Sequence, residues 1–206
     1  MICAMKNVTV ANIKQDPAEI ILEAAIQRFS EYGYNKTTMA EIAEDAGMST
    51  ANIYRYFKNK EEIAASCAKN FMCERSDSLK HIIRNNKLNA VEKLQSYVLT
   101  TLDITQQKAI ENKKIDEMCT AITRNRADLV HNKIKDEIAL LVEILSYGNQ
   151  TGEFKVDNVM DTAESIHAML VVFDVPMFMH LFSKEEFEHK ARSVVRIIIN
   201  GLKNGV

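Results

Sequence analysis

The side chains best suited to hydrogen-bond a polymer of bases and phosphates gather in one short stretch, residues 49–60. Asparagine can pair bidentately with adenine and arginine with guanine, while threonine and alanine can contact the thymine methyl group. Hydroxyls, lysines and helix N-termini bind phosphate oxygens. These types and spacings predict an interface with double-stranded DNA, made by Thr38, Ser49, Thr50, Ala51, Asn52, Tyr54, Arg55, Tyr56 and Lys60.

Two short helices are predicted to carry these side chains. "TMAE" at residues 38–41 is a capping box, in which the Thr38 hydroxyl and the Glu41 carboxylate satisfy backbone N–H groups of the first turn. Ser49 caps a second helix over about Thr50 to Phe57. Gly47 lies between them and supplies the positive φ that a tight turn requires.

A longer helix precedes this pair. "DPAE" at residues 16–19 places an N-cap Asp16 before a proline, and the helix is predicted to stop at Gly33. Three such helices form a helix-turn-helix unit. Apolar residues at helical spacing predict its core: Ile42, Ala43, Ala46, Ile53 and Phe57.

The rest of the chain reads as helical throughout, which predicts an all-α protein of about nine helices. Asn59, Asn89 and Ser183 are predicted N-caps. A long helix is predicted over Ala127 to Tyr147, stopped by "GNQTGEF", and the last helix is predicted to stop at Gly201. The expected organisation is a flexible tail (1–15), a DNA-binding domain (16–62) and a helical domain (63–206).

The run "ILEAAIQRFSEYGYNKTTMAEIAEDAGMSTANIYRYFKNKEEI" resembles the N-terminal DNA-binding domain of the TetR/AcrR family of repressors. The matching pieces are "AA…F…GY…TT…IA..AG.S…IY.YF..KEE", over about a fifth of the chain. Met48 stands where the family usually has valine, and Ala51 replaces a frequent glycine. Neither change blocks docking on DNA, and Ala51 affects how closely the recognition helix approaches a backbone or a methyl group.

The resemblance implies a homodimer that contacts its partner through the last two helices and binds a palindromic operator. It also implies a small-molecule effector in the C-terminal helical domain, whose binding releases the DNA. Residues 1–60 carry seven Lys/Arg and seven Asp/Glu, so nonspecific attraction to DNA should be modest. Specific binding would then depend on a dimer that reads two half-sites.

The effector cavity is expected between the fourth and eighth helices. That half is rich in Leu, Ile, Val, Met and Phe, which favours an apolar or amphipathic ligand. Candidate lining residues are Phe71, Tyr97, Met118, His167 and Phe173. His167 and Asp174 lie on one helix face, either as a polar spot of the cavity, as a pH-sensitive dimer contact, or as a hydrogen-bonded interface pair.

Other chemistry finds little support. Cys73, Asp77 and His81 share a helix stripe, but the span is too long for one metal ion without a bend, and a solvated face is the alternative reading. No nucleophile–base pair, phosphate loop or HExxH motif is present, so we expect no catalytic residue, no metal site and no cofactor.

The four cysteines lack CxxC spacing, and neither a signal peptide nor a membrane-length apolar run is present. The composition therefore favours a cytoplasmic protein without membrane contact. Two alternatives stay open besides the ligand-released repressor. One is a DNA-bound accessory or activator protein without a small-molecule ligand, and the other is a helical domain that has lost DNA binding.

Overall fold

The computed structural model describes residues 16–112 and 114–205, and the predicted tail 1–15 lies outside them. The described residues form nine α-helices, one short 3-10 turn and no strand, which confirms the all-α prediction. In chain order these are α1 (Pro17–Tyr32), α2 (Met39–Asp45), α3 (Thr50–Ile53), α4 (Lys60–Ile83), α5 (Ala90–Glu111), α6 (Ile115–Asn125), α7 (Ala127–Thr151), α8 (Val159–Asp174), η1 (Pro176–Phe178) and α9 (Lys184–Asn204).

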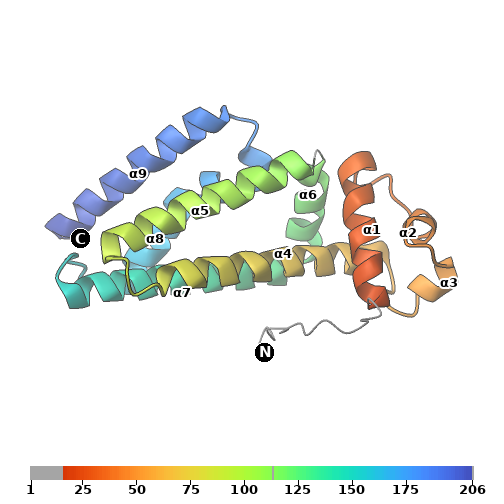
Figure 1. Ribbon diagram of the computed structural model, residues 1–206, viewed down its shortest axis with the longest axis horizontal. Coiled ribbons are helices and arrows are strands. Elements are labelled where there is room, and N and C mark those ends of the chain that lie inside the picture. The colour runs from red at the N-terminus through yellow and green to blue at the C-terminus, as the bar shows by residue number, and fades with distance from the viewer. Residues whose placement is uncertain (1–15, 113, 206) are drawn as a thin grey trace.

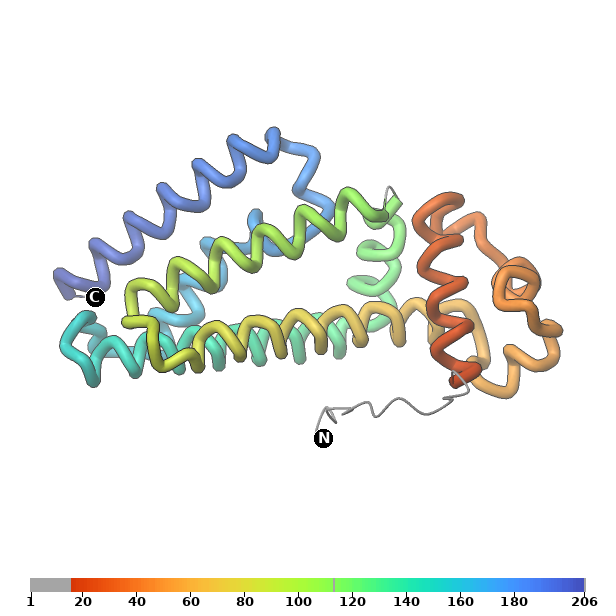
Figure 2. The backbone as a smooth tube through the Cα atoms, in the orientation of Figure 1, coloured from red at the N-terminus to blue at the C-terminus, as the bar shows by residue number. Residues whose placement is uncertain are grey.

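The molecule is elongated, with α1 to α3 at one end and the larger bundle at the other (Figure 1). Helix α4 runs from the small end deep into the bundle, alongside α7 (Figure 2). The short α6 stands between α1 and the rest of the bundle and contacts α1, α4 and α7. Helices α4 and α6 therefore connect the two ends of the molecule.

Two apolar cores correspond to these two ends. The smaller is built on Ile21, Phe29, Ile42, Ile53 and Ile63, all 4% exposed or less, and it also takes in Ile122 of α6. The larger core gathers apolar side chains of α4, α5, α7, α8 and α9. Helix α4 contributes its first turns to one core and its last turns to the other. A domain boundary at residue 62 thus stays a prediction, inside a helix that both cores share.

The predicted caps are confirmed. Thr38 and Ser183 each close a capping box with the glutamate three residues later, and Asn89 does the same with Glu92. Asp16, Ser49 and Asn59 accept from the first turns of α1, α3 and α4. Local side-chain chemistry thus fixes where most helices begin.

Three predicted helix ends were wrong. Helix α3 ends at Ile53, and the chain continues through turns to Tyr56. Helix α7 passes through Gly148 and ends at Thr151, with Gly152 as its C-cap. The aromatic ring of Phe154 packs on Gly148, where a Cβ atom would lie 2.0 Å from the ring. Helix α9 passes through Gly201 to Asn204. No described helix is long and apolar enough to cross a membrane.

Candidate DNA-binding surface and effector cavity

The recognition helix presents most of its predicted DNA contacts to solvent. Ser49 and Ala51 are exposed, as are Tyr54, Arg55 and Tyr56 behind them, with Tyr54 53% exposed. Thr50 and Asn52 are partly buried on the same short helix. Beneath them Ile53 and Phe57 are buried in the small core, as predicted. The helix is anchored by its apolar side and leaves its polar side free.

An ion-pair cluster joins α2 to α1. The Arg28 guanidinium of α1 donates to Asp45 and lies 3.2 Å from the Glu41 carboxylate. A hydrogen bond from Arg28 lowers the pKa of Asp45. These acids are therefore neutralised within the unit rather than directed at DNA.

Lys60 has partners of its own. Its ammonium donates to the carbonyl oxygens of Tyr34 at 2.6 Å and Thr37 at 2.7 Å, and it lies 4.5 Å from the centre of the Tyr34 ring. The predicted phosphate contact of Lys60 would require the ammonium to leave these carbonyls. The structure instead places Lys60 as a clamp on the loop between α1 and α2.

A cavity of about 430 Å³ lies where the two ends of the molecule meet. It is lined by α1, α4 and α6, by the α5–α6 junction, by Val130 and Lys133 of α7, and by residues 174–176 after α8. Its α4 wall reaches from Cys67 to Arg75, a length of about 12 Å at 1.5 Å per residue. The volume falls in the range of small-molecule sites.

The structure divides the predicted lining residues. Phe71 and Met118 lie on the cavity wall. Tyr97 and Phe173 are each 3% exposed and belong to the larger core, while His167 is partly buried outside the cavity. These three do not line this cavity, because helical spacing does not distinguish a core-facing side chain from a cavity-facing one. The cavity also takes a wall from α1, outside the predicted range of helices four to eight.

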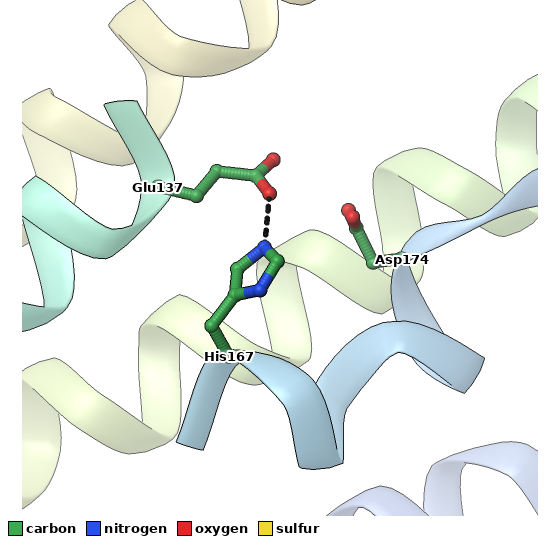
Figure 3. Close-up of side chains that lie close together, drawn as sticks. All are labelled: Glu137, His167 and Asp174. Atoms are coloured by element: carbon green, nitrogen blue, oxygen red, sulfur yellow. Dashed lines mark hydrogen bonds and ion pairs between the residues drawn. The ribbon is translucent and has the colours of Figure 1, made fainter. Parts of the chain in front are cut away.

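A buried cluster of charges closes the cavity at its far end. Arg75 of α4 lies 2.9 Å from the Glu137 carboxylate of α7 and also pairs with Asp174, the last residue of α8. Lys133 lies 2.9 Å from Glu137 and bonds Asp174 as well. The His167 Nε2 atom lies 3.0 Å from Glu137, as Figure 3 shows. Two cations and two carboxylates thus tie three helices together.

The cluster is internally balanced. Burial alone would raise the pKa of Glu137, but the hydrogen bond with His167 and the charges of Arg75 and Lys133 outweigh it and lower that pKa to about 2. Burial alone would lower the pKa of Arg75, yet Asp174 and Glu137 raise it. Both groups therefore stay charged at neutral pH.

The carboxylates and the imidazole of this cluster are close enough for a metal ion. One ligand atom each from Glu137, His167 and Asp174 lies within 4.8 Å of the others, and this is the one such group among residues 16–112 and 114–205. Arg75 and Lys133 already occupy both carboxylates, so a cation would have to displace them. The geometry fits an ionic lock better than a metal site. The Cys73, Asp77 and His81 stripe does not form such a group.

Two cysteine thiols face the cavity, Cys67 from α4 and Cys119 from α6. Burial raises the pKa of Cys67 to about 12 and that of Cys119 to about 11. Both are neutral at pH 7, and a neutral thiol is a weak nucleophile. The two residues act as small apolar lining.

Sequence reasoning missed the α1 wall and the charged end of the cavity. Leu22 and Ile26 lie beside the core positions of α1, which gave a signal for a second apolar face. Ile115, Met118 and Ile122 recur at helical spacing in the strongly amphipathic α6. The charged cluster gave a partial signal, because His167 and Asp174 share one face of α8 and Asp174 lines the cavity, whereas Arg75, Lys133 and Glu137 come from two other helices.

Comparison with known proteins decides what this arrangement is. Residues 21–67 match the family described as "Bacterial regulatory proteins, tetR family", and residues 90–195 match the "Tetracyclin repressor-like, C-terminal domain". The chain belongs to the TetR family. This TetR-family chain is a ligand-responsive, DNA-binding repressor by type, which confirms the predicted fold and function.

Three relatives illustrate the match. The Fatty acid metabolism regulator protein of Bacillus subtilis is 25% identical over 201 residues, which cover 89% of this chain and 94% of the relative. The repressor KstR2 of Mycobacterium tuberculosis is 25% identical over 143 residues, or 66% of this chain and 68% of the relative. A solved structure of FadR from Bacillus subtilis in complex with stearoyl-CoA superposes with a TM-score of 0.67 at 23% identity, covering 89% of this chain and 98% of that one. These relatives are regulators and not enzymes.

Proposed function

We propose that this TetR-family repressor binds a palindromic operator as a homodimer and is released by a long-chain acyl compound held in the cavity. The observation that carries the ligand class is the cavity itself, with apolar walls from Leu22, Ile26, Phe71, Met118 and Ile122. The fatty acid regulator that matches nearly end to end supports an acyl chain as the first candidate.

Recognition of DNA is assigned to the exposed side of α3 and the turns that follow it. Asn52 and Arg55 are proposed to read base edges, with Thr50 and Ala51 near thymine methyl groups. Ser49 and Tyr56 are proposed to bind phosphates together with Thr38 at the start of α2. Tyr54 is exposed beside them and completes this surface.

Dimerisation is assigned to α8 and α9. Met169 of α8 is 53% exposed and Ile197 of α9 is 69% exposed, and α8 also exposes Met160 and Val171. A second copy of the same surface would cover them. The dimer would then set the distance between the two recognition helices.

Release is proposed as a shift in population between two dimer geometries. A ligand that binds one geometry more tightly moves the equilibrium by its difference in affinity, and about 1–3 kcal/mol of coupling changes operator affinity about 5–150-fold. The α1 wall of the cavity places the ligand directly against the DNA-binding end.

Selection of bound duplexes from a random DNA pool at about physiological salt tests the DNA part of this proposal. We expect a palindrome with two half-sites. Calorimetry with stearoyl-CoA, and with cholest-4-en-3-one as a rigid apolar comparison, tests the ligand part. Preferential binding of the steroid would replace the acyl compound by a rigid polycyclic ligand class, and recovery of no sequence by a folded dimer would contradict DNA recognition.

A further inference from the structure

The loop between α1 and α2 is held by hydrogen bonds within the DNA-binding unit. Lys60 of α4 donates to the carbonyl oxygens of Tyr34 and Thr37, as described above. The Thr37 hydroxyl, which is buried, donates to the Gly33 carbonyl oxygen at 2.8 Å. This loop is therefore a rigid corner and a good point from which to orient the whole unit.

A side chain of α6 also contacts this loop. The Glu117 carboxylate accepts a hydrogen bond from the Asn35 backbone N–H at 2.8 Å. It also fills the space above Gly33, where an added Cβ would lie 2.6 Å from a Glu117 oxygen. Gly33 has φ +90°, so glycine is needed here both for the backbone conformation and for the close approach of Glu117.

Two further contacts join the end of α1 to the junction before α6. The Lys114 ammonium donates to the Tyr32 carbonyl oxygen at 3.2 Å. The Ser30 hydroxyl donates to the Glu111 carbonyl oxygen at 2.8 Å. Both contacts span more than eighty residues of sequence, so they join the two ends of the molecule.

The other side of α6 faces the cavity. Ile115, Met118 and Ile122 line it at helical spacing, and Glu117 precedes Met118 by one residue, about 100° around the helix. One helix of eleven residues therefore touches both the cavity and the corner. A ligand that shifts the backbone of α6 at Met118 also shifts Glu117, because the two residues are adjacent in one helix.

We propose that Glu117 is the positioning residue that fixes the angle of the DNA-binding unit against α6, and that ligand binding acts by breaking its bond to Asn35. The release step of this inference rests on the proposed function, whereas the positioning role of Glu117 depends on no ligand. With Glu117 engaged, the two recognition helices of a dimer hold one separation. With Glu117 withdrawn, the Lys114 and Ser30 contacts at the end of α1 remain, but the loop itself is no longer held by α6, and the separation varies.

Glu117→Ala tests the joint, with Glu117→Gln as the conservative variant and Asp116→Ala as the matched control. Glutamine keeps an acceptor for the Asn35 N–H, and Asp116 is an exposed acid on the same helix. We expect faster amide hydrogen exchange over residues 33–37 in Glu117→Ala alone. We also expect Glu117→Ala to discriminate less between the selected operator and one with a base pair inserted between the half-sites.

Release by stearoyl-CoA supplies the second readout. Glu117→Ala should bind stearoyl-CoA as the wild type does. The fold-decrease in operator affinity that stearoyl-CoA causes should, however, be at least five times smaller in Glu117→Ala than in the wild type. The inference would be overturned if Glu117→Ala matched the wild type in amide exchange, in discrimination of half-site spacing and in release by stearoyl-CoA. If the wild type binds no stearoyl-CoA, the proposed ligand class fails, while the exchange and spacing experiments still decide the role of Glu117.

Gly33→Ala provides an independent check through a double-mutant cycle. The substitution carries a cost from the positive φ and another from contact with Glu117. Removing the carboxylate relieves only the second cost. We therefore expect Glu117→Ala to recover part of the stability lost in Gly33→Ala, and strictly additive effects would contradict the contact.

Discussion

The two ends of this molecule are stabilised in different ways. The DNA-binding end has a small apolar core, side-chain caps on its helices, and charges such as Arg28 and Asp45 at its surface. The bundle end contains a buried cluster in which Arg75, Lys133, Glu137 and Asp174 share two positive and two negative charges. The difference indicates a DNA-binding end stabilised by apolar packing and helix caps, joined to a bundle in which an ionic lock of buried charges connects α4, α7 and α8.

The largest effect should come from breaking that lock. Arg75→Met leaves Glu137 and Asp174 buried without their guanidinium partner and should cost about 3–5 kcal/mol of unfolding free energy. Arg84→Met is the matched control, because Arg84 pairs with Glu143 at the surface, where such pairs contribute about 0–1 kcal/mol. Urea unfolding measures both. Similar small losses in the two variants would show that the cluster carries no special stability.

Acid should weaken the lock through Glu137. Its pKa of about 2 lies below the ordinary value of 4.5, so its contribution is present above about pH 4.5 and is lost as the pH falls toward 2. Each unit of the shift corresponds to about 1.4 kcal/mol. The stability difference between the wild type and Glu137→Gln should therefore be largest at pH 6 and shrink toward pH 3. A difference independent of pH would remove Glu137 from the lock.

Substitutions on the recognition helix should separate the two ends. Asn52→Ala and Arg55→Ala should each cost about 1–3 kcal/mol in binding the selected operator and relax its sequence preference, with the fold unchanged. Arg84→Ala is the control, since Arg84 pairs with Glu143 at the surface, outside α3 and outside the proposed dimer helices α8 and α9. Competition binding measures the effect. An unchanged preference in both variants would contradict the assignment of α3.

Two equivalent caps sharpen the comparison at the smallest scale. Thr38→Ala and Asn89→Ala each remove a capping box and should each cost about 0.5–2 kcal/mol of stability. We expect DNA binding to weaken in Thr38→Ala only, because Asn89 lies at the start of α5, outside the DNA-binding end and the proposed dimer helices. If Thr38→Ala and the wild type, both fully folded, bind the operator with equal affinity, Thr38 does not contact phosphate.

The DNA-binding end could be predicted from the sequence because its determinants are local. Thr38, Gly47 and Ser49 act on residues within one helical turn, and Ile42 and Ile53 announce their burial by spacing. The cavity could not be predicted in the same way. Whether Phe173 faces a core and Met118 a cavity depends on how α4, α6 and α8 pack, which no local pattern records.

Two single residues show the same limit. Gly148 reads as a helix stop, yet it lies inside α7 because Phe154 requires the space of its missing side chain. Lys60 reads as a free cation beside the recognition helix, yet three backbone carbonyls of residues 34–37 lie within hydrogen-bond reach of its ammonium. In both cases the partner lies in another loop, so that only the folded chain brings the pair together.

The measurement that tests the central claim most directly is release of a fluorescent operator by stearoyl-CoA, compared among the wild type, Cys119→Phe and Thr120→Phe. Cys119 borders the cavity, whereas Thr120 is exposed beside it on α6 and does not line the cavity. We predict release of the wild type and Thr120→Phe, and operator binding that resists the ligand in Cys119→Phe. Equal release of all three proteins would contradict a ligand acting through this cavity.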